Sequence, residues 1–202
     1  MKLVKFSLTP PIAAISVALG VTSTALATNW YVSSNGSWDP ESKGKTRTTI
    51  TSAIKDASPE DTIWVKNNFV CTNETATSKD GSKNNLVIDK AVMVRSEHGY
   101  VDEANNVWAK ICGRYDSASS PCGGNGTRCV YMTTGATLVG FVLESGATSD
   151  YNHGSYPGGG AIYGVGTVSN CVIRNCWGTT GGAIRNKSES LSSCLVLENC
   201  II

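Results

Sequence analysis

The sequence lacks a strong excess of charge of either sign, and it has few charged residues altogether. Lysine and arginine number 17 against 16 aspartates and glutamates, and charged residues make up 16% of the chain. A surface this close to neutral gives no long-range attraction toward nucleic acid or an anionic membrane. Low charge together with 21 glycines is typical of an extracellular all-β protein rich in turns, and it argues against a helical bundle.

Long apolar runs are also missing. The N-terminal run Ile12–Leu19 is shorter than the roughly 20 residues that a membrane-spanning helix needs. Lys2 and Lys5 precede this run, and the small residues of Ala25–Ala27 follow it. This order is typical of a cleavable secretory signal peptide. A retained membrane anchor is disfavoured, because the polar residues 22–24 interrupt the apolar character.

We therefore expect residues 1–27 to be a signal peptide and residues 28–202 to be the mature domain, secreted or held at the cell surface or outer membrane. Removing Lys2 and Lys5 leaves fifteen basic residues against sixteen acidic ones, a net charge of −1. The residue directly after the cleavage site is Thr28 and not a cysteine, so a lipoprotein anchor is not expected. The mature chain is expected to contain no transmembrane segment.

Motifs for metal binding and carbohydrate cleavage are absent as well. All eight cysteines lie in the mature part, where disulfides can persist, but their connectivity cannot be deduced from spacing. No Cys-x-x-Cys pair occurs, and Cys171 and Cys176 have no histidine near them, so a zinc site is not expected. Lyases and glycosidases need clustered carboxylates, whereas the acidic residues of the C-terminal third are scattered: Glu144, Asp150, Glu189 and Glu198.

Single candidates for chemistry remain isolated in the sequence. His153, between Asn152 and Gly154, is the best candidate for a general acid or base, ahead of His98. Arg174 and Arg185 belong to different repeat elements, and we expect solvated surface roles for both. Asp116 stands alone in its loop. No nucleophile, base and orienting group come together, so we expect no catalytic, cofactor-binding or metal site and no cofactor.

The N-terminal part of the mature chain predicts a strand, a short helix and a second strand. Residues 30–33 form an apolar run followed by an Asn-Gly turn signal. Four apolar residues then fall at i, i+3, i+4 and i+7, one face of a helix that Pro59 ends: Ile50, Ala53, Ile54 and Ala57. The β-branched and aromatic run at residues 62–65 predicts the next strand.

The middle of the chain predicts short strands separated by polar segments. Residues 72–85 are expected to form an exposed loop, and strands are expected at 86–88, 91–94 and 108–112. The Ser-, Gly- and Asn-rich stretch that follows contains Cys122 and is bounded by Cys112 and Cys129. A local disulfide among these three and free buried thiols are equally compatible with the sequence.

The C-terminal third repeats itself, most clearly over residues 136–202. Residues 136–146 align without gaps on 166–176 at an offset of 30, and the end of that block returns at 196–200, 24 residues further on. The Gly-Gly-Ala-Ile of 159–162 recurs at 181–184, an offset of 22. Such periods, made of short strands and turns, predict a parallel β-helix whose coils stack to bury a common interior.

Stacked coils place equivalent side chains about 4.8 Å apart, so identical residues form ladders. Asn175 is expected beneath Asn199 at a corner, since asparagine tolerates left-handed backbone angles. The cysteines are expected to stack in the same way as thiols, Cys171 and Cys176 facing Cys194 and Cys200. Vertical disulfides are disfavoured, because adjacent parallel strands rarely orient two Cβ vectors suitably.

Three segments carry a resemblance to a known family: Tyr31–Ser33, Thr49–Ala57 and Asp61–Val65. On these, the whole mature chain resembles secreted right-handed β-helix proteins of the pectin-lyase-like superfamily. The resemblance implies an all-β, right-handed parallel β-helix solenoid in which the short helix caps the N-terminal end. The repeats are also similar to those of polymorphic outer-membrane proteins, which pair Gly-Gly-Ala-Ile with Phe-x-x-Asn. Here Val172 and Val196 stand in place of the phenylalanine.

Together these features favour an exported, noncatalytic scaffold, an adhesin-like or cell-surface module. It would bind polysaccharide or cell-surface partners through its lateral face and through loops at 72–85, 113–128 and 148–158. The alternative is a polysaccharide lyase or glycoside hydrolase of the same superfamily. The apolar Cys200–Ile202 leaves an open edge, so we expect a C-terminally incomplete β-helix or one whose edge pairs with a partner.

Overall fold

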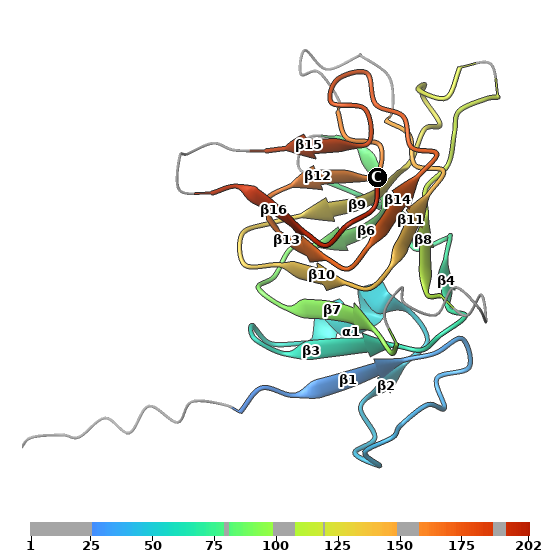
Figure 1. Ribbon diagram of the computed structural model, residues 1–202. Coiled ribbons are helices and arrows are strands. Elements are labelled where there is room, and N and C mark those ends of the chain that lie inside the picture. Colours follow the sequence, from blue (N-terminus) through green and yellow to red (C-terminus); the bar gives the residue numbers. More distant parts are fainter. Residues whose placement is uncertain (1–25, 79–80, 99–107, 119, 149–157, 188–192) are drawn as a thin grey trace, which may run out of the picture.

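The computed structural model describes residues 26–78, 81–98, 108–118, 120–148, 158–187 and 193–202 (Figure 1). The signal-peptide prediction rests mainly on residues 1–25, which lie outside the described residues. Within the described part, no helix is long and apolar enough to cross a membrane.

The described chain is mostly β-strand, arranged in three sheets with one short helix. The seven-stranded sheet has the order β16-β13-β10-β7-β3-β1-β2, and its strands are β1 (Asn29–Val32), β2 (Thr46–Arg47), β3 (Thr62–Val65), β7 (Met93–Ser96), β10 (Thr137–Val139), β13 (Gly166–Ser169) and β16 (Leu195–Glu198). The four-stranded sheet, β14-β11-β8-β4, contains β4 (Val70–Cys71), β8 (Lys110–Cys112), β11 (Val142–Glu144) and β14 (Val172–Arg174). The five-stranded sheet, β15-β12-β9-β6-β5, contains β5 (Ala76–Thr77), β6 (Lys83–Ile88), β9 (Arg128–Met132), β12 (Ile162–Gly164) and β15 (Ile184–Asn186).

From β7 onward the chain visits the three sheets in rotation. The circuits β7-β8-β9, β10-β11-β12 and β13-β14-β15 each add one strand to every sheet, and β16 returns to the seven-stranded sheet. Every strand pair is parallel except β5 with β6. Figure 1 shows the strands of successive circuits lying one above another. Each circuit therefore supports the next through a continuous ladder of backbone hydrogen bonds.

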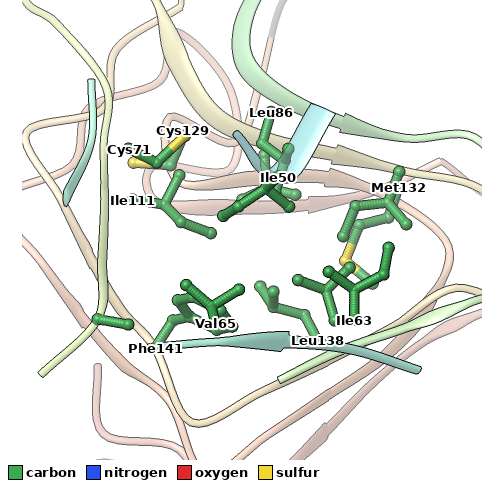
Figure 2. Close-up of a cluster of buried hydrophobic side chains, with 14 of the residues drawn as sticks. Ile50, Ile63, Val65, Cys71, Leu86, Ile111, Cys129, Met132, Leu138 and Phe141 are labelled. Carbon is green, nitrogen blue, oxygen red and sulfur yellow. The ribbon is translucent and has the colours of Figure 1, made fainter. Parts of the chain in front are cut away.

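The space between the sheets is filled by aliphatic side chains (Figure 2). One column of the seven-stranded sheet runs from Ile63 through Val94 and Leu138 to Val168, each paired with the next across the strands and each fully buried. Phe141, at the turn after β10, also lies in this interior. Burying each such side chain stabilises the fold by roughly 1.5–3 kcal/mol, so the interior is the main source of stability.

The predicted helix is confirmed as α1 (Ile50–Asp56), which buries Ile50, Ala53 and Ile54 against the N-terminal strands. Thr49 caps its start, its hydroxyl accepting from the Ser52 amide at 3.1 Å.

Distant side chains complete both ends of α1. The Glu74 carboxylate accepts from the backbone amides of Ile50 and Thr51 at 3.0 and 2.6 Å. Lys90 Nζ donates to three carbonyl oxygens at the other end, within 2.8 Å, those of Ile54, Lys55 and Ala57. A carboxylate at the N-terminus and an ammonium at the C-terminus satisfy the backbone groups that a helix leaves unpaired.

The prediction of an exposed loop over residues 72–85 is wrong for the end of the segment, although residues 72, 73, 75, 77 and 81 are exposed. The segment contains β5 and the start of β6, which pair antiparallel, and Asn84 and Asn85 are fully buried. The Asn85 side-chain amide donates to the carbonyl oxygens of Cys71 and Cys112 and accepts from the Glu74 amide. Polar residues here serve buried backbone groups that would otherwise lack partners, and composition alone does not distinguish that role from solvent exposure.

Two of the three repeat offsets are confirmed by the strand pairing, and one is wrong. Thr137 pairs with Thr167 and Ile162 with Ile184, as the offsets of 30 and 22 require. β16 pairs with β13, Val168 opposite Leu197, so the last block stacks at an offset of 29 instead of 24. Two successive corners have the sequence Asn-Cys, at 170–171 and 175–176. Sequence similarity therefore aligns residues 199–200 with the second corner, although they stack on the first.

Asn199 consequently lies over Asn170, and both follow the same corner geometry. Gly140, Asn170 and Asn199 occupy equivalent places with φ of 79°, 51° and 51°. At the next corner Ser145 and Asn175 are equivalent, with φ of 59° and 52°. Only glycine and a few short polar residues adopt this left-handed region readily, which explains the recurring asparagines.

Replacing Asn170 tests the corner. We expect Asn170→Val to lower the free energy of unfolding by about 1–2 kcal/mol, because a β-branched residue is strained at positive φ. Asn170→Gly should stay within about 0.5 kcal/mol of the parent chain, since glycine adopts this conformation freely. Urea denaturation followed by circular dichroism measures both, and equal effects of the two substitutions would contradict the assignment.

Candidate functional site

Of the residues singled out for chemistry, the described part of the chain brings Arg174 and Glu144 together as an ion pair, and the others lie apart or outside the described residues. His153, Asp150 and Glu189 lie outside the described residues. His98 is exposed, just beyond β7. In the described ranges, no group of three or more histidine, cysteine, aspartate or glutamate side chains is placed to hold a metal ion.

Arg174 lies on the outer face of the four-stranded sheet and pairs with Glu144 of the neighbouring strand. Its Nε and Nη2 both donate to one Glu144 oxygen, at 2.9 and 2.6 Å, and Lys110 lies 3.3 Å from the other oxygen. Burial raises the pKa of Glu144, but hydrogen bonds from Arg174 and Lys110 outweigh it and hold that pKa below its ordinary value. Glu144 is therefore a fixed anion, unsuited to act as a general acid.

Arg185 lies in β15 of the five-stranded sheet, whereas Arg174 lies in β14 of the four-stranded sheet. Its Nη1 donates to the Thr180 hydroxyl at 2.7 Å, and its guanidinium lies 5.9 Å from the Tyr163 ring. Asp116 has a local role in its loop, where it accepts from the Asn125 amide at 2.9 Å. These contacts give all three side chains structural partners.

Asp61, part of the segment that carries the family resemblance, is a buried structural carboxylate. It accepts hydrogen bonds from the Thr28 amide at 2.7 Å, the Ser58 amide at 2.9 Å and the Trp30 indole at 3.0 Å. Burial raises the pKa of Asp61, but these donors outweigh it and the pKa is lowered overall. The carboxylate ties β1 to the start of β3.

A surface hollow of about 220 Å³ is lined mainly by aromatic rings and carboxylates, and we call it the aromatic pocket. It lies on the outer side of β1 and β3, and six residues line it: Tyr31, Trp38, Pro40, Glu41, Trp64 and Glu97. Its surface is mostly apolar. Pockets that bind small molecules generally combine such walls with a few polar groups.

Strand alternation builds this pocket. In β3, Ile63 and Val65 point into the core, so Trp64 points outward. Tyr31 pairs with Trp64 across β1 and β3, which puts the two aromatic rings on the same outer face. Trp38, from the loop after β1, meets Tyr31 edge to face with ring centroids 5.3 Å apart. No local sequence pattern predicts the pocket, because its aromatic residues are separated along the chain and come together only through this pairing.

Charged groups around the pocket balance one another. Lys43 Nζ lies 2.7 Å from Glu41, and the Arg95 guanidinium stacks 4.3 Å from the centroid of the Trp64 ring. Hydrogen bonding to Lys43, Tyr31 and Asn29 lowers the pKa of Glu41 to about 2.

Neither Glu41 nor Tyr31 changes protonation near neutral pH. Burial and its hydrogen bond with Glu41 raise the pKa of Tyr31 to about 12. A group that shuttles protons needs a pKa near the working pH. These two side chains are therefore suited to hydrogen bonding and not to proton transfer.

Comparisons with family models, with curated proteins and with solved structures find no match to this chain.

Asp61→Asn tests the buried carboxylate. At pH 7 we expect the substitution to lower the free energy of unfolding by about 1–3 kcal/mol, because an amide nitrogen would face groups that all donate. The folded-state pKa of Asp61 is depressed, so its stabilisation is present above the unfolded value near 3.9 and is lost as pH falls through the folded pKa.

The difference between parent and Asp61→Asn should therefore shrink on acidification below about pH 4. Urea midpoints measured from pH 7 to pH 2 provide the test, with the exposed Asp89→Asn as control. A difference that stays constant over that range would contradict the role of the ionised carboxylate.

Proposed function

We propose that the mature chain is a right-handed parallel β-helix similar to secreted proteins of the pectin-lyase-like superfamily. Passage of the chain through three sheets in rotation supports the solenoid. The Gly-Gly-Ala-Ile segments stack on adjacent circuits, Ile162 opposite Ile184, as expected of similarity to polymorphic outer-membrane protein repeats. The short helix α1 then serves as the cap of the N-terminal end.

Export of the chain from the cytoplasm would explain the features of its N-terminal sequence. Lys2 and Lys5, the apolar run Ile12–Leu19 and the small residues of Ala25–Ala27 follow the order of a secretory signal peptide. Cleavage after Ala27 would release a domain that is secreted or held at the cell surface or outer membrane. Its function is then exercised outside the cytoplasm.

The proposed function is that of a noncatalytic, adhesin-like scaffold that binds glycans through its lateral face. The observation that carries this proposal is the aromatic pocket on the outer side of β1 and β3. A sugar ring has an apolar C–H face and a rim of hydroxyl groups. The part of the Trp64 ring that Arg95 leaves uncovered offers a flat apolar surface for the first, while the carboxylates of Glu41 and Glu97 are acceptors for the second.

Charge balance favours an uncharged sugar. Glu41 is paired with Lys43, and Arg95 lies against Trp64, so the pocket has no large net charge to select an anion or a cation. The volume of about 220 Å³ is below the roughly 300–1,000 Å³ of sites for drug-sized ligands. The pocket therefore suits a single sugar unit of a neutral polysaccharide, with the rest of the chain crossing the surface.

Trp64→Ala tests the glycan site. Affinity for neutral polysaccharide, measured by affinity electrophoresis or calorimetry, should fall about tenfold or more, since truncating a central aromatic anchor costs about 2 kcal/mol. Trp64→Phe should retain much of the affinity, because a stacking face remains. Trp177→Ala is the matched control, because Trp177 is exposed and does not line the pocket. Equal affinities of the Trp64→Ala and Trp177→Ala variants would refute the site.

Incubation of the chain with the polysaccharides that it binds tests the noncatalytic assignment. We expect neither new reducing ends nor absorbance from unsaturated sugars to exceed that of a chain-free control. Release of either product would support the alternative, a polysaccharide lyase or glycoside hydrolase.

A further inference from the structure

Cys171 and Cys200 lie directly opposite one another on adjacent circuits. Ser169 pairs with Glu198 before them, and Val172 pairs with Ile201 after them, so the register passes through the two cysteines without a break. The Ile201 amide donates to the Cys171 carbonyl at 3.0 Å. Paired parallel positions have Cα atoms about 4.8 Å apart, within the roughly 4.4–6.8 Å that a disulfide accepts.

Both sulfur atoms face the interior in the same way. Cys171 is fully buried. Cys200 is partly exposed and packs against the same core. Each thiol contacts the carbonyl oxygen two residues before it, at 3.3 Å for Cys171 and 3.4 Å for Cys200. The two sulfurs are therefore stacked rather than splayed apart.

Disulfides between neighbouring parallel strands are disfavoured by their geometry, but the backbone at these two cysteines is not regular strand. Regular strands hold two Cβ atoms slightly too far apart for a disulfide, but Cys171 and Cys200 both lie at corners, outside β13, β14 and β16. Among the described strands, none pairs with β16 on its other side. The circuit that carries Cys200 can therefore shift by the fraction of an ångström that a bond requires.

We propose that Cys171 and Cys200 form a disulfide that ties β16 to the circuit beneath it when the chain meets an oxidising environment. Formation of the bond in a cell rests on the proposed export, whereas the capacity to form it rests on geometry alone.

The surroundings of the pair indicate which sulfur reacts first. Hydrogen bonding to the Cys171 thiol lowers the pKa of Cys200 to about 6, and the same contact raises the pKa of Cys171. The more accessible Cys200 therefore loses its proton more readily than Cys171 and forms the thiolate, the reactive form of the side chain.

The oxidant is a low-molecular-weight disulfide. The Cys200 thiolate attacks one of its sulfurs, forming a mixed disulfide and releasing one small thiolate. Cys171 then loses its proton and attacks the Cys200 sulfur, which forms the protein disulfide and releases the second small thiolate. Two protein thiols are oxidised, one small disulfide is reduced, and the two small thiolates take up the two protons.

Peptide mapping tests the proposal directly. The whole chain is equilibrated, folded, in a buffer of reduced and oxidised glutathione, its remaining thiols are alkylated, and its peptides are analysed by mass spectrometry. We expect a peptide pair joined through Cys171 and Cys200. Recovery of both residues as alkylated thiols, or as bonds to other cysteines, would overturn the proposal whether or not the chain binds glycans.

Two variants add a stability readout. Oxidation should raise the thermal midpoint of the parent chain by about 5–10 °C over the reduced chain. Cys200→Ser should abolish this difference, while Cys194→Ser should preserve it. Cys194 is exposed and lies opposite Val165 in the register, where no thiol is available. An oxidised parent chain with an unchanged midpoint and no linked peptide would contradict the proposal.

Discussion

Stacking of parallel strands in unbroken register is the constraint on which the rest of this structure depends. Equivalent residues of successive circuits lie about 4.8 Å apart, so one position in a circuit becomes a column in the whole molecule. Inward columns such as Ile63, Val94 and Leu138 supply the buried apolar surface. Corner columns require left-handed backbone, which Gly140, Asn170 and Asn199 provide. The fold therefore depends on the residue type at each equivalent position of the successive circuits and not on any single contact.

The side chains of the outer columns are not needed to fill the core, so their residue types can serve binding instead of stability. Tyr31 and Trp64 share an outer column of the seven-stranded sheet that continues into Arg95. Strand alternation directs both side chains away from the core, and on that outer side Trp38 packs against the buried Tyr31 ring. On the neighbouring four-stranded sheet, Glu144 is saturated by Arg174 and Lys110, so that charged cluster stabilises the face and offers little to a ligand. The charges of that cluster are paired with one another, whereas the hollow on β1 and β3 is lined by aromatic rings, and we therefore propose the binding site there.

Periodic features were predictable from sequence, whereas features created by pairing between circuits were not. The apolar face of α1, the strand at Thr62–Val65 and the offsets of 30 and 22 are local or self-repeating signals, and the structure has all of them. The offset of 24 failed because two neighbouring corners carry the same Asn-Cys sequence. Asn84 and Asn85 are polar and are expected from the sequence to be exposed, but both are buried and form hydrogen bonds to backbone carbonyl groups. The aromatic pocket depends on the register between β1 and β3, which no local pattern encodes.

The central claim is that this outer face binds an uncharged sugar through the aromatic pocket. A crystal structure of the chain with a neutral oligosaccharide is the most direct measurement. We predict a sugar ring lying flat on the part of Trp64 that Arg95 leaves uncovered, with hydroxyl groups within hydrogen-bonding distance of the Glu41 or Glu97 carboxylates and no movement of β1 or β3. An oligosaccharide bound on another face, with the Trp64 ring uncovered, would contradict it.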